Sequence, residues 1–113
     1  SSHPTFKNAV VHSQEGDTHL MMKEVVPVRL LKNKFYEDIK AAEQRCATKE
    51  ELISLLGRGR AKKGMFEGDM EEGELEIGQV AAGIDRIMPA GEIVAEIIHQ
   101  YNEAISQCGS AVM

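Results

Sequence analysis

The stretch of residues 18–31 is the part of this sequence that most limits the folds open to the chain. Its Val- and Leu-rich composition suits extended structure, but Pro27 lacks a backbone N–H and interrupts the run. We therefore expect two short strands here, or one bent strand. Two short strands do not make a sheet that is stable by itself. The chain is thus expected to be mostly α-helical, and the isolated strands suggest that further structure completes it.

Helical patterns account for most of the remaining sequence. The predicted helices cover residues 4–14, 34–46, 73–87 and 91–107, with a shorter one between Thr48 and Gly57. In the short helix Thr48 and Glu51 form a capping box, and Gly57 is a C-cap. Pro4 suits the first turn of the first helix, whereas Pro89 ends the helix before it.

The helix over residues 91–107 has the clearest amphipathic pattern. Its apolar residues recur at spacings of three and four, so we expect one face to be buried. Gly109 is expected to close this helix, and the tail beyond it is expected to fray.

Composition excludes several classes of function. Hydrophobic residues make up 42% of the 113 residues, which is enough for a packed core. The formal net charge of -5 argues against a nucleic-acid partner. No apolar run approaches the roughly 20 residues that a membrane span needs. Cys46 and Cys108 show no metal-ligand spacing, so we expect reduced thiols in a cytoplasmic protein.

A cluster of cations follows the short helix. Arg58, Arg60, Lys62 and Lys63 lie within six residues, in what we expect to be a loop over residues 58–64. Such a loop can bind phosphate or an acidic protein surface. It can equally be a solvated loop after a helix C-terminus, where the helix dipole favours cations. The residues alone leave both interpretations open.

An acidic run over residues 67–76 comes next. These carboxylates could hold a divalent cation, but their spacing does not match an EF-hand loop. Several of them should instead lie at the start of the helix predicted over residues 73–87, where the helix dipole favours negative charge. We therefore predict no metal site.

Gly73, Gly78 and Gly83 are spaced five apart around Gln79. In a helix interior each glycine would cost about 1 kcal/mol relative to alanine. Close approach of another backbone or of a ligand should offset that cost. The Gln79 amide can donate and accept hydrogen bonds at once. Helix packing and ligand contact are equally compatible with this pattern.

No catalytic set can be assembled from spacing. The four histidines form no metal-binding motif, and no serine or cysteine lies in a recognisable nucleophile elbow. We therefore assign no catalytic residue in this chain.

Taken in order, several motifs resemble the C-terminal part of the FMN-dependent enoyl-ACP reductase II and nitronate monooxygenase (2-nitropropane dioxygenase-like) family. The matching segments are residues 2–7, 17–18, 27–33 and 67–81. The last segment, with its Gly68-Asp69 and Gly78-Gln79 pairs, is fairly specific, and the others are weak singly. Together they cover nearly the whole chain.

The resemblance implies an α/β parent protein, an FMN-binding (β/α)8 TIM barrel, of which this chain is the mostly α-helical C-terminal portion. Residues 1–16 would then be the last barrel helix region, and residues 17–66 a small substrate-side subdomain. Residues 67–113 would be C-terminal helices that return to the barrel. The family's phosphate-binding loops and active-site histidine would lie outside this chain. The chain alone is therefore expected to be colourless and inactive.

The activity implied first is enoyl-ACP reduction in fatty acid synthesis, with electrons passing from NAD(P)H to FMN and then to an enoyl thioester. The alternative is a nitronate monooxygenase on the same scaffold. In either enzyme the flavin supplies the chemistry and the protein places it. A third interpretation is a non-catalytic helical module that binds a protein partner. The expected partners are the remainder of the barrel and the acyl carrier protein thioester, and a homodimer is compatible with the family.

The resemblance also suggests which residues approach the cofactor. Carried over by motif, these are Glu76, Ile77, Gly78 and Gln79, which would lie at the flavin edge. The family often has an apolar residue such as Met where Glu76 stands.

Because acyl carrier protein is acidic, the resemblance also gives the basic cluster a role. We hypothesise that Arg58, Arg60, Lys62 and Lys63 dock the carrier.

Overall fold

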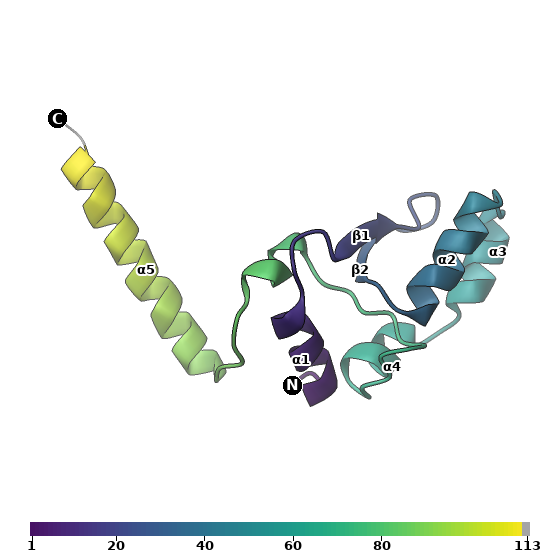
Figure 1. Ribbon diagram of the computed structural model, residues 1–113, viewed down its shortest axis with the longest axis horizontal. Helices are drawn as coiled ribbons and strands as arrows, with labels where there is room; N and C mark the ends of the chain where they lie inside the picture. The colour runs from purple at the N-terminus through teal and green to yellow at the C-terminus, as the bar shows by residue number, and fades with distance from the viewer. Residues whose placement is uncertain (112–113) are drawn as a thin grey trace.

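The computed structural model describes residues 1–111, as a body of short helices around a two-stranded sheet from which one long helix projects (Figure 1). In chain order the elements are α1 (Pro4–His12), β1 (Thr18–Met21), β2 (Val28–Leu31), α2 (Lys34–Gln44), α3 (Lys49–Leu56), α4 (Arg60–Met65), the 3-10 helix η1 (Gln79–Gly83) and α5 (Ala90–Ala111). The prediction of a mostly helical chain with two short strands is confirmed.

β1 and β2 form an antiparallel hairpin. Thr18 pairs with Leu31 at one end and Met21 pairs with Val28 at the other. Pro27 lies immediately before β2, where its missing N–H removes no ladder hydrogen bond. On its other side β2 makes an isolated bridge from Leu30 to Glu76, so a third segment covers part of the hairpin.

Two clusters of buried residues form the core, and β2 contributes to both. The larger cluster joins the hairpin to α2 and α3 and consists of Met21, Met22, Leu30, Phe35, Tyr36, Ile39, Ala42 and Leu52. The smaller cluster joins α1 to the chain after α4 and consists of Phe6, Val10, Leu31, Leu75 and Ala81. Leu30 and Leu31 are successive residues of a strand and point to opposite faces. β2 therefore packs into both clusters and connects them.

Local signals in the sequence place α1 and α3 correctly. Pro4 is the first residue of α1, and the His3 ring accepts a hydrogen bond from the Thr5 N–H. Both bonds of the predicted capping box between Thr48 and Glu51 are present at the start of α3. Gly57 ends α3 with a φ of 65°, which glycine adopts without steric cost.

α2 ends at Gln44, two residues before the predicted end. Cys46 has a φ of 58° and is exposed. The Cys46 N–H donates to Glu43 O and the Ala47 N–H donates to Ala42 O. These two bonds form a Schellman motif, which satisfies the last carbonyls of the helix. The helix therefore cannot continue through Cys46.

The loop predicted over residues 58–64 is wrong, because residues 60–65 form α4. Gly64 lies inside this short helix, where glycine is intrinsically unfavourable. A Cβ at Gly64 would lie 2.8 Å from Leu75 Cδ2 and 3.1 Å from Gly73 Cα. Tertiary packing therefore requires a glycine here, and it outweighs the local preference for a loop.

The helix predicted over residues 73–87 is also wrong. Residues 74–78 are extended. In the rest of the predicted range, up to residue 87, the only helical element is the 3-10 helix η1. The backbone groups of this segment bond to distant residues: the Glu74 N–H donates to Arg60 O, and the Ile77 N–H donates to Arg29 O. Long-range hydrogen bonds thus replace those that a helix would have made. The acidic run is accordingly not at a helix start.

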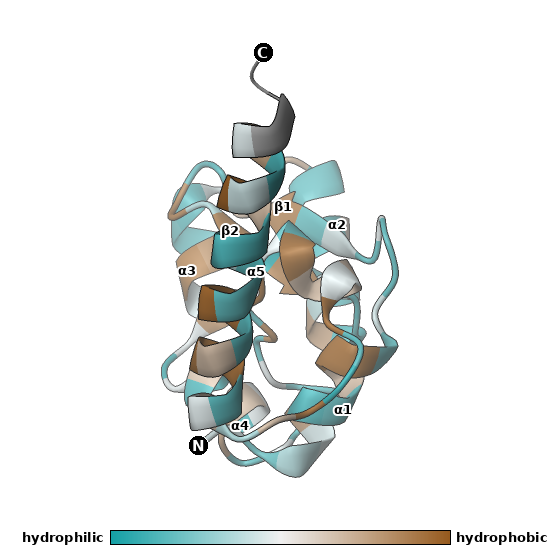
Figure 2. Cartoon of the chain, turned by 90° about the vertical axis from the view of Figure 1, so that its left-hand side faces the viewer, coloured by the Kyte–Doolittle hydropathy of each residue, from teal (hydrophilic) through white to brown (hydrophobic). Residues whose placement is uncertain are grey.

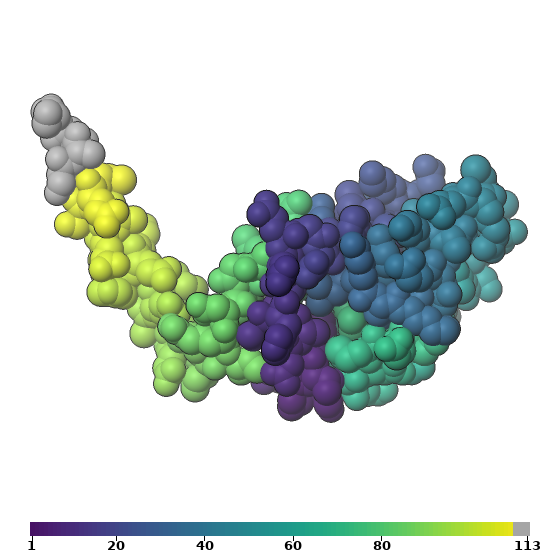
Figure 3. Space-filling view, viewed as in Figure 1, coloured from purple at the N-terminus to yellow at the C-terminus, as the bar shows by residue number. Residues whose placement is uncertain are grey.

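α5 begins at Ala90, close to the prediction, but continues through Ala111 with Gly109 inside it. The predicted fraying falls partly on residues 112–113, which lie outside the described residues. α5 projects from the body as an isolated arm (Figure 3), and hydrophobic residues recur along it (Figure 2). The apolar residues that are more than 40% exposed on it are Ile93, Val94, Ile97, Ile98, Tyr101 and Ile105.

The projecting α5 makes the molecule much less compact than an ordinary domain. Its radius of gyration is 17.9 Å, whereas a compact chain of this length would have about 13 Å. The face predicted to be buried is therefore uncovered among the described residues. No helix within residues 1–111 combines the length and the apolar character needed to cross a membrane.

Candidate functional site

The candidate site is built on the extended segment that leads to Gly78 and Gln79. Leu75 O accepts from the Leu31 N–H at 3.0 Å, and the Ile77 N–H donates to Arg29 O at 3.2 Å. Both partners belong to β2, so the hairpin fixes the path of the segment. Gly78 then caps η1 through its carbonyl, which accepts from the Ala81 N–H at 3.1 Å. Gln79 is therefore held at a defined position although its side chain is exposed.

Gln79 opens onto a cavity between η1, the hairpin and the turn after α1. The cavity has a volume of about 670 Å³ and is lined by Ser13, Gln14, Glu15, Gly16, Thr18, Arg29, Gln79, Val80, Ala82 and Gly83. The turn is closed by Asp17, whose carboxylate accepts from the Gln14 N–H at 2.7 Å. Gly16 has a φ of 89°, which this tight turn requires. The lining is mixed, and its polar side chains include one full positive charge, on Arg29, and one full negative charge, on Glu15.

The structure separates the four residues predicted to approach a flavin edge. Gln79 lines the cavity that contains Arg29, whereas Ile77 lines an apolar groove with α1 and the start of α5. Glu76 is exposed on the strand-like bridge to Leu30. Gly78 is exposed at the turn between them. Whether these residues contact a flavin stays a prediction.

The spaced glycines have different surroundings. A Cβ on Gly73 would overlap the Gly64 Cα and Asp69 O and would lie 2.6 Å from Gly64 N. At Gly78 the nearest atom is Val80 Cγ2 at 4.0 Å, and at Gly83 nothing lies within 4 Å. Close backbone approach thus explains Gly73 only. Nothing among the described residues requires glycine at the other two positions, and ligand contact there stays a prediction.

Glu74 is a buried carboxyl just before this site, with 8% of its surface exposed. The pKa of Glu74 is raised to about 7, first by burial and then by the neighbouring charge of Glu76, which disfavours a second negative charge. A hydrogen bond with Glu76 acts in the same direction, whereas the positive charge of Arg60 opposes it. The Glu74–Glu76 pair therefore retains one proton up to about neutral pH.

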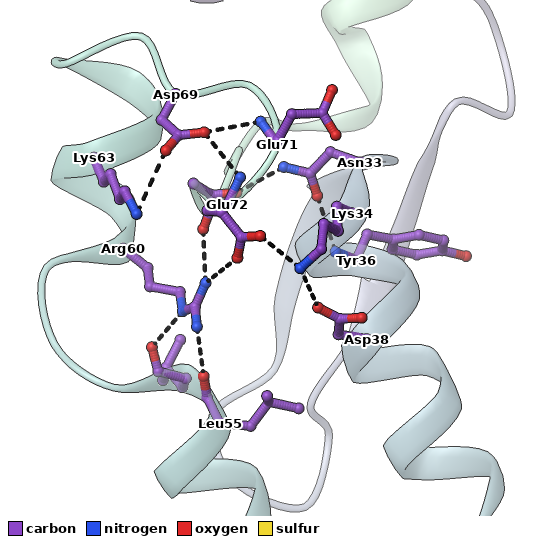
Figure 4. A network of polar contacts seen from close by, with 12 residues as sticks. Asn33, Lys34, Tyr36, Asp38, Leu55, Arg60, Lys63, Asp69, Glu71 and Glu72 are labelled. Atoms are coloured by element: carbon purple, nitrogen blue, oxygen red, sulfur yellow. Dashed lines mark hydrogen bonds and ion pairs between the residues drawn. The ribbon is translucent and has the colours of Figure 1, made fainter.

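Arg60 is the centre of a polar network that anchors the acidic segment (Figure 4). Its guanidinium donates to Leu55 O, Leu56 O and Glu72 O at 2.8–3.1 Å. It also forms an ion pair with the Glu72 carboxylate at 3.3 Å and lies 4.6 Å from the centre of the Phe35 ring. All three guanidinium nitrogens are engaged, which is typical of a structural arginine.

Neighbouring charges complete this network. A hydrogen bond from Lys34 is the largest cause that lowers the pKa of Glu72, and Glu72 in turn raises the pKa of Lys34. Asp69 accepts from the Glu71 and Glu72 N–H groups, and the bond from Glu72 is the largest cause that lowers its pKa. Asp69 and Glu72 therefore stabilise the conformation of residues 69–72. Within residues 1–111 no group of three metal-ligating side chains could hold a metal ion.

The four predicted docking cations do not share one environment. Arg60 is half-buried in the network, whereas Arg58, Lys62 and Lys63 are exposed. Lys62 pairs with Glu67 at 3.7 Å and Lys63 pairs with Asp69 at 3.4 Å, both at the surface. Exposed pairs of this kind contribute little and can exchange partners. Arg58, Lys62 and Lys63 remain available to an acidic partner, and the docking role stays a prediction.

Sequence reasoning did not assign Arg29 to the candidate site. Arg29 lies in the motif over residues 27–33 and Thr18 in the motif over residues 17–18, so both were visible as motif residues. Their proximity to Gln79 depends on hairpin pairing and on the Ile77–Arg29 hydrogen bond. Neither contact can be read from spacing along the chain.

Three comparisons relate this geometry to known proteins. The family model described as nitronate monooxygenase matches residues 1–100. The structure of FabK from Thermotoga maritima superposes with a TM-score of 0.87 at 26% identity, over 99% of this chain and 35% of that one. A single-residue mutant of the same FabK gives a TM-score of 0.79 at 26% identity, over 99% of this chain and 33% of that one. No curated protein matches. The chain spans about a third of the length of the structures that it matches.

Proposed function

The chain belongs to the nitronate monooxygenase family of flavin-dependent oxidoreductases, and from this premise we propose that it is the C-terminal part of an FMN-dependent enoyl-ACP reductase. The observation that carries the proposal is the superposition on FabK over 99% of the chain at 26% identity. The superposed region includes α5. A helix that projects from the body is an uncommon feature, so its inclusion in the match supports the proposal.

The uncovered face of α5 supports the proposal that a longer protein contains this chain. Six large apolar side chains on one 22-residue helix are more than 40% exposed. A monomeric protein rarely exposes a continuous apolar surface of this kind. We propose that the remainder of a (β/α)8 barrel covers it, since the matched structures are about three times as long as this chain.

The proposed cofactor is FMN, reduced by NAD(P)H. The exposed Gly78 and Gln79 fit contact with the edge of a flat ring, because a Cβ at Gly78 would meet nothing closer than 4.0 Å and the Gln79 amide can both donate and accept. FMN would supply the redox chemistry. Gly78 and Gln79 would bind and orient its edge, with Ile77 in the apolar groove and the exposed Glu76 beside them.

The experiment that tests this function uses the full-length protein that contains the chain. We expect a yellow protein with one FMN, which oxidises NAD(P)H when a crotonyl thioester is supplied under anaerobic conditions. Absence of flavin from a folded, full-length protein would contradict the family-level proposal. Flavin without thioester-dependent NAD(P)H oxidation would contradict the reductase.

The second candidate is a nitronate monooxygenase, which the description of the matching family model favours. It would consume oxygen with an alkyl nitronate and would not need NAD(P)H. Measurement of oxygen uptake with nitronate, beside thioester-dependent NAD(P)H oxidation on the same preparation, separates the two activities.

We also propose that the exposed cations at α4 dock acyl carrier protein, which is acidic. Replacement of Arg58, Lys62 and Lys63 by Gln, with Arg60 left intact, should raise the KM for carrier-bound substrate. The KM for the same acyl group on a carrier-free thioester should not change. The matched control is Lys40→Gln, an exposed cation on α2. An unchanged KM for the carrier-bound substrate would refute this docking site.

A further inference from the structure

The cavity beside Gln79 contains a cation that the proposed function does not use. Two arginines within residues 1–111 are half-buried, Arg29 and Arg60. Every guanidinium nitrogen of Arg60 has a protein partner, as described above. Arg29 uses a single nitrogen, Nη1, which donates to Thr18 O at 3.1 Å and to Thr18 Oγ1 at 3.3 Å.

The charge of Arg29 is not balanced within the described part of the chain. No ion pair joins Arg29 to a carboxylate there, although Glu15 lines the same cavity. Nε and Nη2 also have no hydrogen-bond partner among these residues. A guanidinium has five N–H donors in a planar fork, and that fork matches the oxygens of a phosphate or carboxylate. A half-buried arginine with unused donors is therefore prepared for an anion.

Arg29 is also connected to the candidate site through its backbone. Its carbonyl accepts from the Ile77 N–H at 3.2 Å, and Ile77 directly precedes Gly78 and Gln79. The side chain of Arg29 and that of Gln79 line one cavity of about 670 Å³, which is large enough for part of a ligand. A ligand that places its reacting group near Gln79 would present its more distant groups to Arg29.

We propose that Arg29 binds the phosphate group of a ligand that enters the cavity shared with Gln79. Thr18 positions the guanidinium by occupying Nη1, and Nε and Nη2 are left to make paired hydrogen bonds to phosphate oxygens. This inference rests on the proposed function for the identity of the ligand. The phosphate of FMN is expected to bind loops outside this chain, and two other ligands of that reaction carry phosphate: the nicotinamide nucleotide and the phosphopantetheine arm of the thioester substrate.

The test compares matched ligands with and without phosphate on the flavin-loaded, full-length protein. One pair is reduced nicotinamide mononucleotide and reduced nicotinamide riboside. The other pair is the crotonyl thioester of phosphopantetheine and that of pantetheine. For one pair we expect kcat/KM to favour the phosphorylated member by about tenfold or more, because a charge-assisted pair of hydrogen bonds is lost without the phosphate. The pair that shows this preference identifies the ligand.

Variants assign the preference to Arg29. Arg29→Gln should reduce the ratio of the two kcat/KM values to about one, and Arg29→Lys should retain part of it. Lys40→Gln, which removes an exposed cation remote from the cavity, should leave the ratio unchanged. A purely structural role would lower both members of a pair equally and would not change the ratio. Equal effects in both pairs, or no preference in the unmodified protein, would overturn the proposal.

Calorimetry with inorganic pyrophosphate separates this proposal from the proposed function. If the protein shows no turnover, pyrophosphate binding that weakens about tenfold or more in Arg29→Gln would still support an anion site at Arg29. If Arg29→Gln does not fold, Arg29→Lys provides the same comparison with a smaller expected effect. Binding that is equal in the variant and the unmodified protein would refute the site.

Discussion

Gly73 and Gly78 lie five residues apart in one segment, yet their surroundings are opposite. Gly73 is buried against the backbone of Gly64, so that a single methyl group would overlap the backbone of α4. Gly78 faces open space at the edge of a cavity lined by Arg29 and Gln79. Glycine thus allows two backbones to pack in contact at Gly73, whereas at Gly78 it lies next to unfilled space. Only the open position leaves space for a ligand to approach the backbone.

The largest effect is expected at the closed position. Gly73→Ala should lower the free energy of unfolding by about 3 kcal/mol or more, because backbone atoms of Gly64 and Asp69 cannot move aside as a side chain can. Urea unfolding of the full-length protein measures the change. Gly83→Ala is the matched control and should change stability by about 0.5 kcal/mol or less, since nothing lies within 4 Å of its Cβ. Equal effects would remove the distinction between the two positions.

Arg60→Ala should have the next largest effect, about 2–4 kcal/mol of lost stability. The substitution removes the hydrogen bonds to Leu55 O, Leu56 O and Glu72 O and leaves the Phe35 ring uncovered. Thermal unfolding compared with that of Arg58→Ala, an exposed neighbour, gives the measurement. If Arg60→Ala were as stable as Arg58→Ala, the network would not hold the segment in place.

Glu74 makes stability depend on pH in the direction opposite to most carboxylates. Its folded-state pKa of about 7 lies above the ordinary value of 4.5, so folding favours the protonated form. That contribution is fully present below about pH 4.5 and is lost as the pH rises through about 7, by roughly 1–3 kcal/mol. Urea unfolding across this range should show the decline, and Glu74→Gln should flatten it. A profile that is the same in both proteins would contradict the assignment.

The smallest effect on stability is expected at the open position. Gly78→Ala should change the free energy of unfolding by about 0.5 kcal/mol or less. If a flavin edge approaches Gly78, the added methyl group should weaken FMN binding by about tenfold, measured by fluorescence titration of the apoprotein. Gly91→Ala, at the start of α5 with nothing within 4 Å, is the control. Unchanged FMN affinity would exclude Gly78 from contact with the cofactor.

Several elements could be predicted because their signals in the sequence are local. Pro4 at the start of α1, the Thr48–Glu51 capping box and Gly57 at the end of α3 each act within a few residues. The apolar periodicity of α5 likewise needs no information from elsewhere in the chain. The ordered motifs were also enough to indicate the family, which the match over residues 1–100 confirms.

The remaining elements and the candidate site depend on contacts between distant segments. Gly64 and Gly73 let the backbone of α4 lie in contact with the chain that precedes residues 74–78, and long-range hydrogen bonds of Glu74 and Ile77 replace the predicted helix. The backbone bonds of Ile77 and Leu75 to β2 bring Gln79 beside Arg29, fifty residues earlier in the chain. Hydrogen bonds and steric contacts between distant segments leave no periodic trace in a sequence. Local patterns therefore predicted most of the helices, and only the packed chain could assemble the candidate site.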